Sequence, residues 1–278
     1  MERSVASVTM AFPPARLIAM PVNHSNMALL EDQIAVITGA GSGIGRETAT
    51  TFADHGAAVV VADIDVEGGE ATVETITDAG GEATFVETDV SDPDDAKAMI
   101  ETAVDEYGGL DILYNNAAIE GPVAKLEEYD NDAFEQVIDV NLKGVWYGMK
   151  YGIEAMLADG GGSIISASSI GGEVAVPQYS GYGAAKAAVS HLTKYAALEY
   201  AEDGIRANAV APGIVRTEMI ERTIEEHPEM EEQFQNTEPM PGLADPEEIA
   251  NAVVFLASDL SSRVTGTTLP VEGGYLAQ

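Results

Sequence analysis

Short apolar runs rich in valine and isoleucine alternate along the chain with longer segments whose apolar residues recur at helical spacing. This alternation is typical of a parallel sheet whose two faces are covered by helices. The expected strands are residues 33–38, 57–62, 82–86, 110–114, 162–167, 205–210 and 267–271. The expected helices are residues 43–55, 67–78, 93–107, 131–158, 180–201 and 246–258. The pattern therefore predicts an α/β fold with a doubly wound seven-stranded parallel sheet, in a single domain over residues 29–278.

Residues 214–242 interrupt this alternation. Apolar residues recur there at helical spacing between many carboxylates, which suggests short amphipathic helices. The carboxylates are Glu218, Glu221, Glu225, Glu226, Glu229, Glu231 and Glu232, and the apolar residues are Met219, Ile220, Ile224, Met230 and Phe234. Two interpretations remain, a solvated charged flap and a lid whose apolar side closes over a substrate. We favour the substrate lid.

The net charge argues against two classes of binding partner and bears on the environment of the protein. The chain of 278 residues carries 47 acidic and 13 basic side chains, for a formal charge of -34. Such a charge repels nucleic acid and anionic membrane surfaces, so neither is an expected partner. An ordinary acidic protein and an adaptation to a high-salt cytoplasm both explain it. Because only six of the basic residues are lysines while acidic residues crowd the expected helix faces, we favour the high-salt origin.

The residues that commonly bind metals are scarce. The chain has no cysteine, which excludes disulfides, thiol catalysis and thiolate metal sites. Its histidines lie far apart in the sequence, at His24, His55, His191 and His227. None has the spacing of a ligand pair, so we predict no metal requirement.

Residues 1–28 differ in composition from the rest. Their only charged side chains are Glu2, Arg3 and Arg16, which leaves 46 acidic against 11 basic residues over 29–278. Pro13 and Pro14 interrupt the one apolar stretch, which is too short to span a membrane. We expect a disordered extension, no membrane partner, and a soluble cytoplasmic protein.

A glycine-rich turn follows the first expected strand and opens a helix. It reads Thr38-Gly39-Ala40-Gly41-Ser42-Gly43-Ile44-Gly45. Glycines there permit a tight turn and let main-chain N–H groups approach a pyrophosphate at the helix N-terminus. The turn predicts a Rossmann-type nucleotide site in which the contacts come from Gly39, Ser42, Gly43, Ile44 and Gly45.

Asp63 closes the second expected strand. A carboxylate at that point accepts hydrogen bonds from ribose hydroxyls and repels a 2′-phosphate, so it predicts NAD rather than NADP as the cofactor. Neither Ala40 nor Ser42 offers a cation for the extra phosphate. A structural alternative is a helix cap, a role that Asp65 could also fill.

Tyr182 and Lys186 lie four residues apart in an expected helix, so an ammonium group lies on the same face as a phenol. A nearby positive charge lowers a tyrosine pKa toward the working pH, which is what a general acid and base requires. Tyr179 has Gly183 at the same spacing and is the weaker candidate. Ser169, thirteen residues before Tyr182, supplies a hydroxyl that could complete the site.

These motifs together resemble the short-chain dehydrogenase/reductase family, in its branch of about 250 residues, from about residue 31 to the C-terminus. The resemblance rests on the turn at Thr38–Gly45, Asp89-Val90, Asn115-Asn116-Ala117-Ala118, Asn141, Ser169, Tyr182 with Lys186, and Pro212–Thr217. Each is moderately specific alone, and their order and spacing make the set highly specific. Ala118 departs from the family, which usually has glycine there, and adds a methyl group without removing a reacting atom.

For the cofactor, the resemblance implies contacts beyond the glycine turn. Asp89 and Val90 resemble the pair that touches the adenine ring, and Asn115 begins the segment along the adenosine side of the cleft. Val215 and Thr217 resemble the positions that bind the nicotinamide carboxamide.

For the chemistry, the resemblance implies that Ser169 binds the substrate oxygen, Tyr182 exchanges the proton, and Lys186 assists both Tyr182 and the nicotinamide ribose. Asn141 resembles the asparagine that holds a relay water beside this lysine, and Ser168 is taken as structural. Four residues between Ser169 and Tyr182 could either form a wall of the substrate site or be purely structural, and both alternatives stay open. They are Glu173, Val174, Gln178 and Tyr179.

The expected function is NAD-dependent oxidation of a secondary alcohol to a ketone, reversibly, by hydride transfer. Two alternative enzyme activities are a sugar 1-dehydrogenase of the glucose type and a 3-oxoacyl reductase. A remote alternative is a nucleotide-binding regulator without catalysis. The resemblance also implies a homotetramer built on the helices 131–158 and 180–201 and the C-terminal segment.

Overall fold

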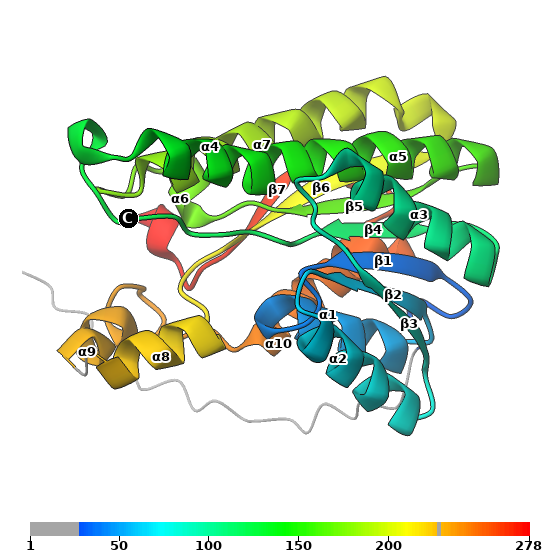
Figure 1. Ribbon diagram of the computed structural model, residues 1–278, viewed down its shortest axis with the longest axis horizontal. Helices are drawn as coiled ribbons and strands as arrows, with labels where there is room; N and C mark the ends of the chain where they lie inside the picture. The colour runs from blue at the N-terminus through cyan, green and yellow to red at the C-terminus, as the bar shows by residue number, and fades with distance from the viewer. Residues whose placement is uncertain (1–27, 227–228) are drawn as a thin grey trace, which may run out of the picture.

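A seven-stranded sheet, parallel throughout, forms the centre of the computed structural model, which describes residues 28–226 and 229–278 (Figure 1). The strand order is β3-β2-β1-β4-β5-β6-β7. The strands are β1 (Ile34–Thr38), β2 (Ala58–Asp63), β3 (Glu82–Glu87), β4 (Ile112–Asn115), β5 (Gly162–Ala167), β6 (Ile205–Pro212) and β7 (Thr268–Val271). The predicted α/β doubly wound sheet is confirmed, because every strand lies within two residues of its expected bounds.

Helices cover both faces of the sheet (Figure 1). One face carries α1 (Gly43–Asp54), α2 (Val66–Asp78) and α10 (Pro246–Ala257). The opposite face carries α3 (Pro93–Tyr107), α5 (Gly144–Asp159) and α7 (Ser180–Glu199). The connections through α1 and α2 run in one direction along the sheet and those through α3, α5 and α7 in the other, so right-handed crossovers place the two groups on opposite faces. The connection from β6 to β7 through α10 has the opposite hand, because α10 packs on the face of α1.

The core has two halves, one on each side of the sheet. Successive strand side chains point to opposite faces, so Ile37 packs in one half and Val36 in the other. Both side chains are completely buried. Each half is closed by helix side chains such as Phe52 of α1 and Met149 of α5. Burying one such side chain contributes about 1.5–3 kcal/mol, so the two halves fix the position of the loops at the strand ends.

The helical stretch expected over 131–158 is confirmed in extent, but it is not a regular α-helix throughout. It consists of α4 (Asn131–Ile138), a π-helical segment η2 (Asp139–Lys143) and α5. Asn141 lies inside the π-helical segment, where its fully buried side chain bonds to the main chain of Ile119. Apolar spacing stays helical through the whole stretch, and the partner of Asn141 lies in a distant loop. The interruption therefore leaves no periodic signal in the sequence.

The segment 214–242 contains α8 (Glu218–Glu226) and α9 (Glu229–Gln235), which extend away from the two helix layers (Figure 1). Its base is fixed to the chain that leads into α10, because the Arg216 N–H donates to the Ala244 carbonyl at 2.8 Å and the Ala244 N–H to the Ile214 carbonyl at 3.2 Å. The side chains of Met219, Glu226, Glu229 and Glu232 lie outside the described set, as does the predicted extension up to residue 27.

Short helices complete the chain: η1 (Leu126–Glu128), α6 (Ile170–Glu173), η3 (Ala201–Asp203), η4 (Asp259–Ser261) and η5 (Tyr275–Ala277). Within the described ranges, no helix combines the length and the apolar character that crossing a membrane requires.

Candidate active site

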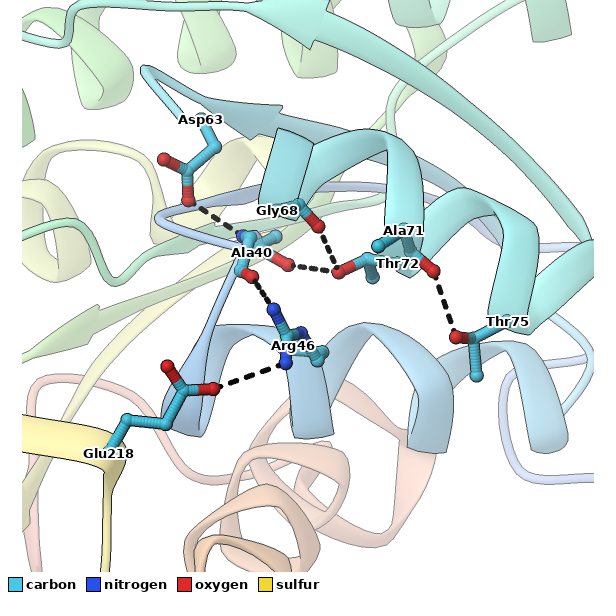
Figure 2. A network of polar contacts seen from close by, with 9 residues as sticks. Ala40, Arg46, Asp63, Gly68, Ala71, Thr72, Thr75 and Glu218 are labelled. Atoms are coloured by element: carbon cyan, nitrogen blue, oxygen red, sulfur yellow. Dashed lines mark hydrogen bonds and ion pairs between the residues drawn. The ribbon is translucent and has the colours of Figure 1, made fainter. Parts of the chain in front are cut away.

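The glycine turn after β1 is held by hydrogen bonds from three elements (Figure 2). From β2, the Asp63 carboxylate accepts from the Gly41 N–H at 2.6 Å. From α2, the Thr72 hydroxyl donates to the Ala40 carbonyl at 2.9 Å, and from α1 the Arg46 guanidinium donates to the Gly41 carbonyl. Because these bonds fix the main chain of the turn, its N–H groups at the start of α1 are preorganised for an anion.

The loop after β4 lies against the same turn. The Thr38 hydroxyl accepts from the N–H groups of Asn116 and Ala117 at 2.9 and 3.0 Å, and the Asn116 amide donates to the carbonyls of Thr38 and Gly39. Gly39 has a φ of 65°, and a Cβ there would lie 2.8 Å from the Ala117 Cα. Only glycine allows this close approach of the two loops.

A cleft of about 700 Å³ opens between these loops. It lies at the carboxyl ends of β1 and β4, the neighbours at which the order of strands reverses, and such points are where open α/β sheets bind ligands. Most of the expected cofactor contacts line it, namely Gly39, Ser42, Gly43, Ile44, Asp63, Asp89, Val90 and Thr217. The structure therefore brings these residues from four segments of the chain to one cavity.

Five of the expected cofactor contacts are not among the lining residues: Tyr182 and Lys186, which belong to the reacting groups, and Gly45, Asn115 and Val215. A Cβ on Gly45 would lie 2.0 Å from the Gly39 carbonyl oxygen, so this glycine serves the packing of the turn. The buried Asn115 side chain lies 3.4 Å from the Ser166 hydroxyl and fills the space left by Gly148. Val215 is buried in the core. Gly45, Asn115 and Val215 stay predictions as cofactor contacts, and the nearby Asn116 and Thr217 line the cleft.

Carboxylates dominate the charge of the cleft. Its lining residues include Asp63, Asp89, Asp132, Glu135, Asp139 and Glu218, and no lysine or arginine is among them. Asp63 is well oriented, because its second oxygen accepts from the Asp65 N–H at 2.9 Å. Arg46 lies behind the turn, where it pairs with Glu218 at 3.3 Å (Figure 2). A ligand bearing an added phosphate would meet repulsion over most of this surface.

The predicted reacting groups converge where β5 ends and α7 begins. Ser169 follows β5 and caps α6, with its hydroxyl 3.1 Å from the Gly171 N–H. The same hydroxyl bonds to Tyr182 in the first turn of α7. One turn later, the buried Lys186 extends below the Tyr182 ring, with its ammonium 5.6 Å from the ring centroid and 2.7 Å from the Ala167 carbonyl. A hydroxyl, a phenol and an ammonium group therefore form one continuous set.

The ionisation of this set departs from the expectation. Burial raises the pKa of Tyr182 above its ordinary value, and the hydrogen bond from Ser169 only partly opposes this. Burial also lowers the pKa of Lys186, to about 8. The expected lowering of the tyrosine pKa by Lys186 is thus wrong for this structure. Desolvation outweighs the charge of an ammonium that points to the Ala167 carbonyl.

Asn141 is committed to a different partner from the one expected. Its Oδ1 accepts from the Ile119 N–H and its Nδ2 donates to the Ile119 carbonyl, both at 2.8 Å. The side chain therefore positions the loop after β4. The relay water stays a prediction, and it would have to bind elsewhere on this residue.

Ser168, expected to be structural, faces away from the cleft. Its hydroxyl lies 2.7 Å from the Ser190 hydroxyl and 3.1 Å from the Lys186 carbonyl, both on α7. Ser190 in turn donates to the Glu173 carboxylate at 2.9 Å. This chain of contacts joins β5, α6 and α7 behind the reacting groups.

Sequence reasoning missed three residues that shape the site: Asn116, Arg46 and Glu120. Asn116 belongs to a family motif, whereas no sequence pattern marks Arg46 or Glu120. Glu120 lies close enough to Tyr179 to accept a hydrogen bond and to act on the ionisation of Tyr182. All three act across loops, where no periodic spacing marks them.

For metals, the described residues contain no group of three or more histidine, aspartate or glutamate side chains with ligand geometry. His55 caps the C-terminus of α1, whereas His191 lies on α7. The site fits a nucleotide cofactor, because the turn has room for an anion and Asp63 offers hydrogen-bond acceptors beside it.

Comparison with known proteins agrees with this geometry. A family model described as Enoyl-(Acyl carrier protein) reductase matches residues 39–276. The cyclohexanol dehydrogenase of Acinetobacter sp. (strain SE19) is 44% identical over 248 residues, 89% of this chain and 96% of that protein. The cis-4-hydroxycyclohexanecarboxylate dehydrogenase of Sinomonas cyclohexanicum is 44% identical over 246 residues, 88% and 97% of the two chains.

Among solved structures, carveol dehydrogenase from Mycobacterium avium in complex with NAD superposes with a TM-score of 0.86 at 32% identity. The match covers 90% of this chain and 99% of that one. The family model alone spans Gly39, Ser169, Tyr182 and Lys186, and these relatives and the solved structure each cover 88–90% of the chain. The chain belongs to the short-chain dehydrogenase/reductase family.

Proposed function

We propose that this protein is an NAD-dependent dehydrogenase that oxidises a secondary alcohol to a ketone, reversibly. The observation that carries the proposal is the convergence of Ser169, Tyr182 and Lys186 beside a cleft that contains Asp63. The names of the relatives, which refer to a cyclohexanol and a hydroxycyclohexanecarboxylate, support a cyclic alcohol as the substrate class.

The cleft fits a dinucleotide. The N–H groups of the turn at Ser42 and Gly43 would hold the pyrophosphate, and Thr217 faces Gly43 across the cleft. Asp63 would accept hydrogen bonds from the ribose hydroxyls, while Asp89 and Val90 would bound the adenine end. NAD rather than NADP is favoured by the Asp63 carboxylate and by the absence of a cation among the lining residues. The NAD found with carveol dehydrogenase supports the same choice.

When bound, NAD supplies the carbon that accepts the hydride. The chain's own groups handle the oxygen of the substrate and its proton. Ser169 would hold the substrate oxygen by a hydrogen bond, and Tyr182 would take the hydroxyl proton in oxidation or return it in reduction. Lys186 lies one turn below and, when charged, favours the phenolate. Its lowered pKa of about 8 makes this help dependent on pH near neutrality.

The test replaces Tyr182 with phenylalanine. Tyr182→Phe should keep NAD affinity, measured by calorimetry, while turnover with secondary alcohols falls by about a hundredfold or more, because the proton acceptor is gone. Tyr195→Phe on the same helix is the matched control and should stay active, because it removes a hydroxyl far from the reacting groups and keeps the aromatic ring. Retained turnover in Tyr182→Phe would refute the assignment of the acid and base.

We also propose a homotetramer. Its support is the set of large apolar side chains that α5 and α7 leave exposed, namely Trp146, Leu157, Tyr195 and Leu198. Leu198 is 83% exposed, and an apolar patch of this kind is typical of a subunit contact. Light scattering of the wild type and of Leu198→Glu tests it: the variant should form smaller assemblies.

A cytoplasmic, high-salt setting is the last part of the proposal. The chain's formal charge of -34 supports it, since dissolved salt screens the repulsion among the carboxylates.

The residues 214–242 are proposed as the lid over the substrate. Thr217 and Glu218 line the cleft, and the base of the segment is fixed to the chain that leads into α10.

A further inference from the structure

Glu120 lies at the edge of the cleft, in the loop that follows β4. The two residues before it, Ala118 and Ile119, line the cleft. Its carboxylate lies within hydrogen-bonding reach of the Tyr179 hydroxyl. Burial is the main cause of the raised pKa of Tyr179 and of Tyr182, and the Glu120 charge adds to it. Glu120 is itself exposed, so the carboxylate remains accessible to a ligand beside the reacting groups.

The main chain on both sides of Glu120 is fixed. Before it, Ile119 is held at both its N–H and its carbonyl by the Asn141 side chain. After it, Gly121 turns with a φ of 73°, and a Cβ there would lie 2.5 Å from Val137. Packing and hydrogen bonds therefore set the main-chain position from which the Glu120 side chain projects.

The partner residue Tyr179 is held in a similar way. The loop around it pairs with the loop after Glu120 through a bridge between Ala124 and Tyr179 and a bond from the Ala124 N–H to the Gln178 carbonyl at 3.0 Å. Gln178 has a φ of 73°, which costs a residue with a side chain about 1 kcal/mol or more. Strain of this kind is kept where the surrounding structure enforces a particular direction of the chain.

We propose that Glu120 and Tyr179 form a polar subsite that selects neutral cyclic substrates with a second hydroxyl group and excludes substrates with a carboxylate. The proposal rests on the proposed alcohol dehydrogenase function and names its substrate class. A carboxylate is an acceptor only, so it bonds to a substrate hydroxyl and repels a substrate anion. Tyr179 has a single O–H, which it can give to the Glu120 carboxylate in the free enzyme or to the oxygen of the same substrate group when the subsite is occupied.

The subsite predicts different turnover for a cyclohexanediol and for the hydroxycyclohexanecarboxylate that appears in one relative's name. A cyclohexanediol has its second hydroxyl free to meet Glu120, whereas a hydroxycyclohexanecarboxylate brings a second negative charge to the same end of the cleft. Two unit charges a few ångströms apart at the edge of a protein repel enough to cost about tenfold or more in affinity. The neutral diol should therefore be the better substrate.

The experiment measures kcat/KM by NAD reduction for cyclohexanol, the isomeric cyclohexanediols and cis-4-hydroxycyclohexanecarboxylate, with the wild type, Glu120→Gln and Glu120→Ala. Glutamine keeps an acceptor and removes the charge, so it should raise kcat/KM for the carboxylate by about tenfold and keep part of the diol preference. Alanine removes both, so the diol preference over cyclohexanol should disappear as well. The two variants thus separate charge from hydrogen bonding.

Glu127→Gln is the matched control, because it removes the same charge from an exposed position on η1 a few residues away. It should leave the ratio of carboxylate to diol turnover unchanged. An equal ratio in Glu120→Gln and Glu127→Gln would overturn the subsite while leaving the dehydrogenase intact. A wild type that reduces NAD with none of the alcohols would instead refute the proposed function, and the subsite with it.

Discussion

The Asn141 side chain pairs with both main-chain polar groups of Ile119, with an Oδ1 to N distance of 2.8 Å and an Nδ2 to O distance of 2.8 Å. The contact joins a π-helical segment to the loop after β4, 22 residues apart in the sequence. It also explains why the helix is interrupted there. A continuous α-helix would turn this side chain away from the loop.

Replacing Asn141 with alanine should weaken both the fold and the site. Two hydrogen bonds are lost and two main-chain groups of Ile119 lose their partner, which costs about 1–3 kcal/mol of unfolding free energy. Because Glu120 follows Ile119, KM for the alcohol should rise more than KM for NAD. Urea unfolding and steady-state kinetics check the two effects.

Asn131→Ala, at the exposed start of α4, is the control for the loss of an asparagine from this stretch. It should be as stable as the wild type within a few tenths of a kcal/mol. An Asn141→Ala protein of wild-type stability would contradict the importance of the contact.

Replacing Asp63 with asparagine should relax the choice of cofactor. The amide oxygen can still accept from the Gly41 N–H, so the turn keeps its shape, but the charge that opposes a 2′-phosphate is removed. We expect the ratio of kcat/KM for NAD to that for NADP to fall by about tenfold. Asp65→Asn removes the same charge two residues away and should leave the ratio nearly unchanged. A ratio unaffected by Asp63→Asn would show that other groups choose the cofactor.

Replacing Lys186 with methionine should stabilise the protein at pH 7 while it removes activity. Burial lowers the pKa of Lys186 from 10.5 to about 8, so the native chain binds fewer protons than the unfolded chain between these values, and wild-type stability rises with pH across that window. The cost of burying the charge is about 3 kcal/mol below pH 8 and is absent above pH 10.5. Losing the bond to the Ala167 carbonyl offsets about 1–2 kcal/mol of the gain.

The expected net gain for Lys186→Met is therefore about 1 kcal/mol at pH 7 and turns into a loss at pH 10. Urea unfolding at both pH values measures it. Lys194→Met, exposed on the same helix, should differ little from the wild type at either pH. A stability difference between Lys186→Met and the wild type that is the same at both pH values would contradict a lowered lysine pKa.

Replacing Glu120 with glutamine should shift the pH profile of alcohol oxidation to lower pH. Oxidation needs Tyr182 in its deprotonated form, and the Glu120 charge raises the pKa of that phenol. Removing the charge lowers the pKa, so kcat/KM should begin its rise at a lower pH. The other titrating groups near Tyr182 are Lys186 and Tyr114, and both remain in the variant. A profile that coincides with that of Glu127→Gln would contradict the link.

Salt should stabilise the protein and tighten NAD binding. Six carboxylates line the cleft, and in dilute buffer they repel the pyrophosphate as well as one another. We expect the melting temperature to rise and KM for NAD to fall between 0.1 M and about 2 M potassium chloride, because the Debye length shrinks to about 3 Å or less. Full stability and unchanged KM in dilute buffer would count against the high-salt setting.

Much of the fold and part of the site follow from the sequence. Apolar periodicity locates the strands because the direction of a side chain repeats every two residues in a strand and about every 3.6 in a helix. The glycine turn and the pairing of Tyr182 with Lys186 are likewise local, since the residues lie within one or two turns of chain. Asp63 is identifiable from the sequence because it stands at the end of a strand that the apolar periodicity predicts.

The rest depended on contacts between distant segments. Asn116 meets Thr38 across 78 residues, and Glu120 meets Tyr179 across two loops, so neither pair has a spacing that repeats. The direction of the Tyr182 pKa depended on how much of the protein surrounds the phenol, which no spacing between Tyr182 and Lys186 reveals.

The sequence by itself determined the order of strands and helices, the nucleotide turn and the identity of the reacting groups, because each depends on the geometry of neighbouring residues. Only the tertiary structure decided which side chains face the cleft, where the long helix is interrupted, and which effect dominates the ionisation of Tyr182 and Lys186. Desolvation and loop pairing are sums over atoms from many segments, and they exist only once the chain has folded.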